Sequence, residues 1–397
     1  MSAGPPTLSK PERRHDLDWL RVLAMLAVFM FHCVHIFDPL DYHVKDAAGS
    51  QAALVIVGFM DAWLMPLFFL LSGAATWFSL QTRGAGAYVG ERFTRLAVPL
   101  FTVGALLLLP PQFYWDGLTH GRGWGFAQAC AAYFSTIGPN ARGGFLMFWA
   151  GHLWFLYFLL VISLVCLPVV LLMKRKGGRG FLAWLSALSD RWGGAFLPAI
   201  PLVALLLLLR PVPGYHDLRS LACYILFFLL GVALPAQPGF TRSAVKNRWI
   251  ALALGLAAFG SIGAMLGAGL EPWLEQPVSG SVALYHVCAG VNAWAWIVFL
   301  LGTAGRYLSR SNAFLRYANE AVLPFYILHQ TALLFVATFV VTLAWTWGFK
   351  LLLLATASFT LIMLAYELVV RRFGVVRFLF GMRPRKPRPG QADAKGL

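Results

Sequence analysis

The sequence predicts an all-α, polytopic integral membrane protein with about ten transmembrane helices and both termini in the cytoplasm. Of its 397 residues, 59% are hydrophobic and only 12% are charged, and the mean hydropathy is +0.70. A soluble globular domain carries roughly a quarter charged residues. The charged residues also cluster between long apolar runs, as expected for a chain that crosses a bilayer many times.

Ten apolar runs are long enough to cross a hydrocarbon layer of ~30 Å. They lie at 17–37, 53–80, 94–110, 149–173, 194–210, 218–237, 249–270, 281–304, 321–343 and 347–370, and the fifth is the shortest. We therefore expect a cytoplasmic segment at 1–16 and a membrane domain at 17–380. The composition of 381–397, which is basic and rich in proline, predicts a disordered tail against anionic lipid.

The basic residues indicate which side each connection faces. With ten spans, the termini and every second connection share one side, which holds 25 of the 32 lysines and arginines. The opposite side holds six, and Arg21 lies within the first span. By the positive-inside rule the side with 25 is cytoplasmic. One omitted span would mix the two sets, so the distribution also supports ten spans.

The net charge of +16 does not indicate a nucleic-acid partner. The basic residues form short clusters between apolar runs, without an aromatic-interleaved groove or zinc-ligand spacing. The five cysteines are scattered through the apolar runs and form no metal motif. We expect no nucleic acid, no metal and no tightly bound cofactor.

The first span contains an arginine and a histidine, and ionisable groups inside a bilayer are costly enough to indicate function by default. Arg21 and His32 are 11 positions apart. That spacing is about three helical turns, so the two side chains share a helix face ~16 Å apart along the axis. A structural explanation stays open, in which the arginine extends to the headgroups and the histidine is buried against another helix.

The expected depths separate arginines from histidines. Arg92 and Arg95 begin the third run on the cytoplasmic side, near the expected depth of Arg21. Together these three arginines would suit an anionic ligand that bears phosphates. Each of them alone also fits an ordinary positive-inside anchor.

The outer half of the predicted bundle contains His32 and Asp61, with His152 at the outer edge and His329 near mid-depth. A histidine beside a carboxylate is held in one tautomer and acts as a general base on a hydroxyl group. Asp61 has a suitable depth to partner His32. Asp18 is the alternative carboxylate, although its position favours pairing with Arg21.

These polar residues belong to short segments that follow one another in a characteristic order. They are 17–32 with Asp18, Arg21 and His32, 66–73 with Ser72, 92–99 with Arg92 and Arg95, 152–156 with His152 and Trp154, 325–329 with Tyr326 and His329, and 366–367 with Glu367, followed by 378–381. From about residue 15 to 385 the sequence resembles the acyltransferase 3 family of integral membrane acyltransferases. Within that family the resemblance is greatest to the glucan biosynthesis protein C branch.

The resemblance implies an enzyme of the bacterial inner membrane that transfers an acyl group from cytoplasmic acyl-CoA to a hydroxyl of an extracytoplasmic glycan. The branch implies a succinyl group, with acetyl as the second choice, and a periplasmic glucan as acceptor. Succinyl-CoA or acetyl-CoA would be a co-substrate. The sequence leaves open whether the acyl group passes through a covalent acyl-histidine and whether the protein forms a homodimer.

The resemblance also assigns roles to residues. His32 would be the catalytic histidine, with His152 as a further candidate in the catalytic group. Asp61 joins this group from its depth alone, not from the resemblance. Arg21, Arg92 and Arg95, together with Ser72, would serve the CoA end of the donor. The remaining motif positions have no assigned role: Asp18, Trp154, Tyr326, His329 and Glu367.

A transporter or flippase of a polar or anionic solute is the alternative function. Ten spans with buried histidine, aspartate and arginine also suit a carrier. Transporters of this size often have paired halves or broken helices at matching positions, and no such pairing is evident in the sequence. Two measurements distinguish these functions. An acyltransferase transfers the acyl group of acyl-CoA to a glycan, whereas a carrier moves solute into liposomes.

Overall fold

The structure, a computed structural model, describes residues 13–136, 148–209, 218–270 and 279–383. Within these ranges the chain forms helices and loops and contains no strand. The prediction of an all-α fold is therefore confirmed for this part of the chain. Of the predicted terminal segments, 1–12 and 384–397 lie outside the described residues.

The first half of the chain supplies shorter and more often broken helices than the second. Its elements are α1 (His15–His35), α2 (Gln51–Asp61), α3 (Leu64–Thr82), α4 (Ala85–Arg92), the π-helical η1 (Phe93–Ala97) and η2 (Leu100–Leu108), α5 (Pro110–Thr119), α6 (Phe126–Thr136), η3 (Phe148–Leu153), α7 (Trp154–Val165), α8 (Leu167–Met173), α9 (Lys176–Ser189), η4 (Gly194–Phe196) and α10 (Ala199–Leu208). The second half contains α11 (Leu218–Ala233), η5 (Leu234–Ala236), α12 (Pro238–Gly267), α13 (Gly280–Tyr307), α14 (Ala313–Val340), α15 (Trp347–Ala365), η6 (Tyr366–Val370) and α16 (Gly374–Leu379).

The described helices are those of a multi-pass membrane protein. Seven are long and apolar enough to cross a membrane, and two further pairs, bent by 43° and 51°, bring the number to nine if each pair is one span. The shorter apolar helix Gly194–Leu208 coincides with the shortest predicted run. The count of ten and the cytoplasmic termini stay predictions.

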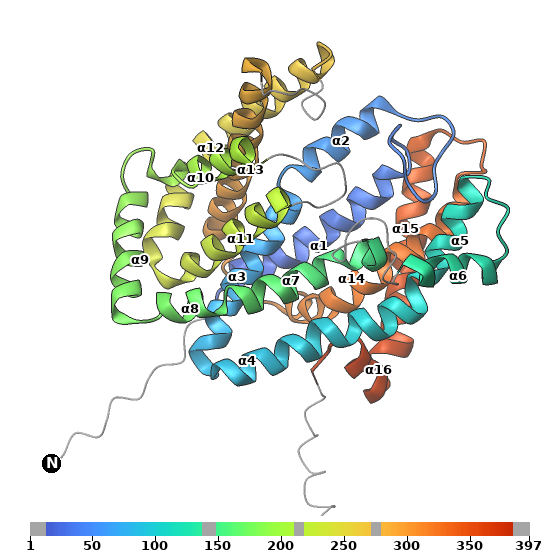
Figure 1. The fold of residues 1–397 in the computed structure, drawn as a ribbon, viewed down its shortest axis with the longest axis horizontal. Coiled ribbons are helices and arrows are strands. Elements are labelled where there is room, and N and C mark those ends of the chain that lie inside the picture. Colours follow the sequence, from blue (N-terminus) through green and yellow to red (C-terminus); the bar gives the residue numbers. More distant parts are fainter. Residues whose placement is uncertain (1–12, 137–147, 210–217, 271–278, 384–397) are drawn as a thin grey trace, which may run out of the picture.

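Helix α1 lies near the centre of the bundle, where it packs against α3, α13, α14 and α15 (Figure 1). Asp16 and Asp18 occupy its first turn, and His32 and His35 its last. This distribution of acidic and basic residues suits the helix dipole. Because α1 is surrounded by other helices, its polar residues face protein.

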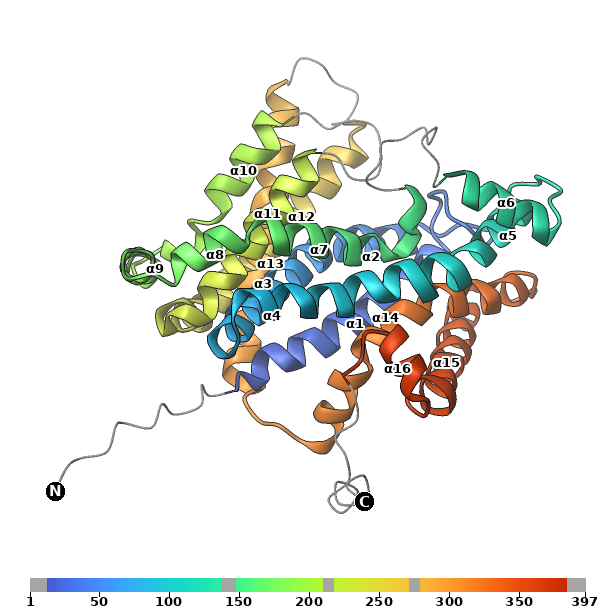
Figure 2. The ribbon, with the colours of Figure 1, turned by 60° about the horizontal axis from the view of Figure 1, so that its bottom comes forward.

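The other helices are arranged around this centre. α8, α9 and α10 lie at one side of the molecule, and α5, α6, α15 and α16 at the opposite side (Figure 2). α12 packs along α13, and α11 packs along α3. The site described below lies between these two sides, around α1, α3, α7 and α14.

Two glycines allow α3 and α11 to approach closely. A Cβ atom added at Gly73 would lie 1.9 Å from the carbonyl oxygen of Phe228, and one added at Gly231 would lie 1.9 Å from that of Leu70. Small residues at such crossings allow two membrane helices to pack backbone against backbone. The crossing fixes α3, which carries Ser72 beside Gly73.

The connection between α1 and α2 is anchored by buried ion pairs. Asp38, fully buried, pairs with His35 and with Lys45 at 2.9 Å. Asp46 pairs with Lys350 of α15 at 2.5 Å. Two backbone hydrogen bonds, Asp46 N–H to Ile36 O at 3.0 Å and Ser50 N–H to Phe37 O at 2.6 Å, hold the loop in shape. The loop thereby holds Tyr42 over the end of α1.

Replacing Gly73 with alanine is expected to destabilise the protein by roughly 1–3 kcal/mol, because the added methyl group forces α3 and α11 apart. Thermal unfolding of the detergent-solubilised protein measures the effect. Gly86→Ala in α4 is the matched control, since a Cβ there meets no atom within 4 Å. Equal midpoints for the two variants would contradict the role of the crossing.

Candidate functional site

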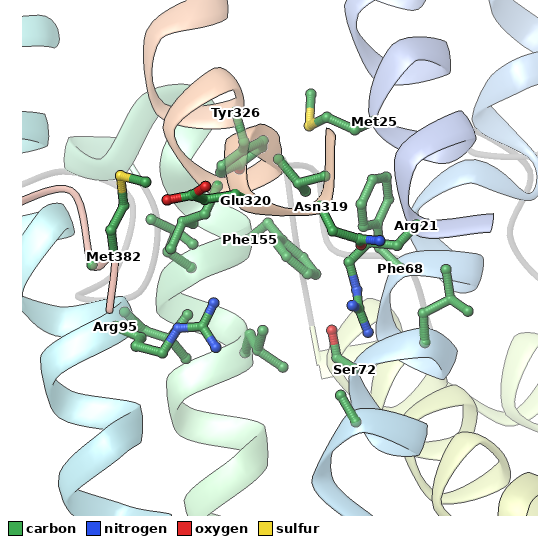
Figure 3. A pocket seen from close by; sticks show the side chains of 18 of the residues that line it. Arg21, Met25, Phe68, Ser72, Arg95, Phe155, Asn319, Glu320, Tyr326 and Met382 are labelled. Carbon is green, nitrogen blue, oxygen red and sulfur yellow. The ribbon is translucent and has the colours of Figure 1, made fainter. Parts of the chain in front are cut away.

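A cavity of about 970 Å³, the main cavity, opens between α1, α3, α4, η1, α7 and α14. Arg21, Ser72, Arg92 and Arg95, which the sequence grouped as ligand-binding residues, all line it. Figure 3 shows Arg21 and Arg95 entering the same space from opposite walls. The structure therefore brings together the four residues that the sequence grouped by depth alone.

More arginines line the main cavity than the sequence motifs suggested. Five further ones come from both ends of the described chain and from its last helices: Arg13, Arg316, Arg371, Arg377 and Arg383. Only two carboxylates, Asp18 and Glu320, line the same cavity. The eight arginines thus leave the cavity with a positive charge of six, which suits a ligand with several phosphates.

Carboxylates hold some of these arginines in place. Asp18 pairs with Arg13 at 2.8 Å and with Arg21 at 3.4 Å. Its predicted pairing with Arg21 therefore agrees with the geometry. Glu320 pairs with Arg377 at 2.9 Å.

Glu367, a motif position without an assigned role, lies beside the cavity. Its carboxylate accepts hydrogen bonds from Arg371 at 2.8 Å and from the hydroxyl of Tyr317 at 2.7 Å. The guanidinium of Arg371 also lies 5.3 Å from the centre of the Tyr317 ring. The geometry gives Glu367 the role of fixing Arg371, which lines the cavity.

The cavity becomes apolar at its deep end. Met25, Val28, Phe68 and Phe155 line this part, together with Tyr326. The Tyr326 hydroxyl donates a hydrogen bond to the backbone carbonyl of His152. Tyr326 therefore lies between the cavity and the histidines.

Three histidines meet directly beyond Tyr326. The ring centre of His329 lies 5.2 Å from that of His32 and 5.3 Å from that of His152. They come from α1, from α14 and from η3 just before α7, which are far apart in the sequence. The sequence placed these residues at different depths, and only the packing of these elements brings them together.

His152 uses both ring nitrogens to join neighbouring elements. Its Nε2–H donates to the carbonyl of Ile327 at 3.2 Å, and Nδ1 accepts from the amide of Gln112 at 3.2 Å. Gly151 has φ +47°, a conformation that side chains disfavour, and it turns the chain into α7. His152 therefore connects α5, α7 and α14, and both of its nitrogens are engaged.

His329 has one engaged and one unengaged nitrogen. Its Nδ1–H donates to the carbonyl of Tyr326 at 2.6 Å, so Nε2 carries the lone pair. This Nε2 is buried without a hydrogen-bond partner in the described parts of the chain. An unsatisfied buried nitrogen is uncommon and often belongs to a functional site.

His32 is held by a tyrosine rather than a carboxylate. Its Nδ1 lies 2.8 Å from the hydroxyl oxygen of Tyr42, and the Gln330 amide donates to the same oxygen. Tyr42 and Gln330 are both buried. In the tautomer with the proton on Nδ1, this ring nitrogen donates to the Tyr42 oxygen and Nε2 of His32 carries the lone pair that can accept a proton.

Asp61 lies apart from this group. It is exposed at the break between α2 and α3, close enough to Tyr285 of α13 to interact electrostatically with it. Among the described residues it forms no hydrogen bond or ion pair, with His32 or with any other. Depth along a span suggested the partnership, but Asp61 faces away from the histidines.

Trp154 also serves packing rather than the histidine group. Its ring centre lies 5.6 Å from that of Phe158 and 5.6 Å from that of Tyr224 of α11. It thereby joins α7 to α11. This contact keeps α7 in the register that presents His152.

Sequence reasoning missed Tyr42, Gln330 and Gln112. Gln330 directly follows His329, and a glutamine inside an apolar run was the available signal. Tyr42 lies in a loop and carries no such signal, since its contact depends on how the loop folds back.

In the described chain no cluster of three or more histidines, cysteines or carboxylates is arranged to hold a metal ion.

The arrangement combines an arginine-lined cavity with a group of histidines, one of which, His329, has a buried Nε2 without a hydrogen-bond partner among the described residues. Such a pair of features suits proton transfer on a phosphate-bearing ligand.

No solved structure matches this chain. It is 23% identical over 391 residues to the glucans biosynthesis protein C of Escherichia coli, with 94% of this chain and 95% of the relative covered. The protein of the same name from Salmonella typhimurium is 24% identical over 398 residues, with 96% and 97% covered. The profile of the acyltransferase domain matches residues 14–367, nearly the whole chain, and the protein therefore belongs to the acyltransferase 3 family.

Proposed function

We propose that this protein is a membrane O-acyltransferase that moves an acyl group from cytoplasmic acyl-CoA to a hydroxyl of an extracytoplasmic glycan. One observation carries the proposal. The arginine-lined cavity is also lined by Val28 and Tyr326, which precede His32 and His329 by four and three residues on α1 and α14. A ligand with phosphates at one end and a reactive group at the other fits this arrangement.

The donor follows from the lining of the main cavity. Its arginines suit the phosphates of CoA, and its apolar deep part suits the slender pantetheine arm. Arg21 and His32 are 11 residues apart on one helix face, which is ~16 Å along the axis. One extended acyl-CoA molecule could therefore engage both residues.

The name of the relatives supports a glucan as acceptor. Proteins named glucans biosynthesis protein C match nearly the full length of this chain. We propose a periplasmic glucan as acceptor and, from the resemblance of the sequence motifs alone, a succinyl group as cargo with acetyl second. This function places the protein in the inner membrane of a bacterium, with the arginines on the cytoplasmic side.

His32 supplies the chemistry. Its Nε2 takes the proton of the acceptor hydroxyl while that oxygen attacks the thioester carbonyl carbon. The new C–O bond forms, the C–S bond breaks, and the CoA thiolate then receives the proton from His32. Tyr42 keeps the N–H on Nδ1, and holding both substrates in this geometry supplies the rest of the rate enhancement.

His32→Gln is expected to lower acyl transfer by roughly 10²–10⁴-fold, because the variant loses its general base. Transfer of a radiolabelled acyl group from acyl-CoA to glucan by the protein in liposomes measures the effect. His286→Gln is the matched control, at a buried histidine of α13 that lies outside the histidine group and does not line the main cavity. Activity near the wild-type level would remove His32 from the chemistry. If wild-type protein transports solute but transfers no acyl group, the enzyme proposal is wrong.

Tyr42→Phe is expected to lower kcat roughly tenfold through loss of one hydrogen bond to His32, while KM for the donor stays unchanged. The arginines that would bind the CoA phosphates lie at the other end of α1, with Arg21 ~16 Å from His32 along the helix axis. A general loss of structure would therefore change both constants, whereas loss of the Tyr42 hydrogen bond alone changes kcat. Steady-state kinetics with varied acyl-CoA separates the two effects. Tyr114→Phe, at a tyrosine that packs against Phe126, is the control. A rise in KM with constant kcat would contradict the positioning role.

A further inference from the structure

A second cavity of about 440 Å³, the side chamber, adjoins the main cavity. The two share seven lining residues, of which five are arginines: Arg13, Arg21, Arg92, Arg95 and Arg383. We propose that the side chamber binds the adenosine 3′-phosphate end of CoA, while the shared arginines bind its diphosphate. This assignment rests on the proposed function and adds to it the part of the donor that each cavity recognises.

The charge distribution calls for a ligand with two separate phosphate groups. The side chamber adds Arg14 and Arg83, which do not line the main cavity. Arg14 pairs with the buried Asp16 at 2.6 Å, and Arg83 pairs with Glu91. Among the described residues, ten arginines and three carboxylates line the two cavities together, so positive charge stays in excess after these pairings. CoA carries a diphosphate and, on the ribose, a separate 3′-phosphate. A phosphopantetheine group on a carrier protein carries one phosphate, which would leave the side chamber empty.

The walls of the side chamber suit a nucleoside. Phe78 and Leu17 supply apolar surface, and Ser79 and Thr82 supply hydroxyl groups. An aromatic ring beside arginine side chains is a common setting for a purine base. The Ser79 hydroxyl donates to Glu91 at 3.4 Å and that of Thr82 to the Ser79 carbonyl at 3.3 Å, so each hydroxyl oxygen can still accept a hydrogen bond from a ribose hydroxyl.

Glu91 arranges the arginines between the chambers. Its carboxylate pairs with Arg83 after α3, with Arg95 at 3.6 Å and with Arg383 at 3.2 Å. One negative charge thus offsets the mutual repulsion of three guanidinium groups from three separate segments. Each guanidinium has five N–H donors, so donors remain for phosphate oxygens.

Arg92 differs from its neighbours. It has no carboxylate partner within the described chain, and its guanidinium donates to the Thr76 hydroxyl at 2.9 Å and lies 4.7 Å from the Tyr88 ring centre. An arginine held by neutral groups keeps its full charge for a ligand. Arg92 lines both cavities, which suits a position beside the diphosphate of CoA, because the diphosphate joins the nucleoside to the pantetheine arm.

Calorimetric titration of the full-length protein in nanodiscs with CoA, dephospho-CoA and 4′-phosphopantetheine tests the assignment. We expect wild-type protein to bind CoA roughly tenfold or more tightly than dephospho-CoA, because the 3′-phosphate adds charged hydrogen bonds. Arg83→Gln and Arg14→Gln should each reduce this preference and leave dephospho-CoA affinity unchanged. Arg21→Gln should weaken both ligands alike. Adenosine 3′,5′-bisphosphate should compete with CoA in wild-type protein and compete less in Arg83→Gln.

Arg179→Gln on α9 is the matched control, since Arg179 is exposed and lines neither cavity. Equal affinity of wild-type protein for CoA and dephospho-CoA, together with acyl transfer from acyl-CoA, would overturn the side-chamber assignment alone. So would an Arg83→Gln variant that loses affinity for both ligands equally. If wild-type protein binds none of the three ligands and transfers no acyl group, the proposed function itself fails.

Discussion

The separation of charge along α1 is the constraint on which the rest of the structure depends. Arg21 near one end lies among arginines, whereas His32 near the other end lies among neutral groups. Between them the helix presents Met25 and Val28 to an apolar part of the cavity. Charges buried without a partner are expensive, so a ligand's phosphates stay at the arginine end and only its uncharged part suits the interior.

Each end of α1 meets its electrostatic requirements differently. At the arginine end a few carboxylates, among them Asp18 and Glu91, each pair with more than one guanidinium. They order the arginines and leave an excess of positive charge. At the other end of α1 the hydrogen-bond partners of His32 and His152 are the neutral Tyr42 and Gln112, and Gln330 donates to Tyr42. The buried carboxylate at this end, Asp38, pairs with His35 and Lys45 instead.

Sequence periodicity predicted what lies along one helix, and it failed where two elements must meet. The shared face of Arg21 and His32 and the inner position of Ser72, Arg92 and Arg95 follow from spacing and topology. Depth alone also suggested Asp61 as the partner of His32, but depth does not say which way a side chain points around its helix. The contact with Tyr42 depends on ion pairs such as Asp46 with Lys350 of α15, 304 positions away, which no local pattern encodes.

The histidine group is shielded on two sides. Tyr326 separates it from the main cavity through its hydrogen bond to the His152 carbonyl, and Tyr42 in the α1–α2 loop contacts it beyond the end of α1. Under the proposed function, water that reached the thioester beside the general base would hydrolyse it, so both covers would favour transfer over hydrolysis. Under the proposed function a donor must displace Tyr326, and an acceptor must approach past the loop that orients His32. Because Tyr42 both lies on the approach of the acceptor and orients the His32 ring, entry of the acceptor and the orientation of the base would depend on the same residue.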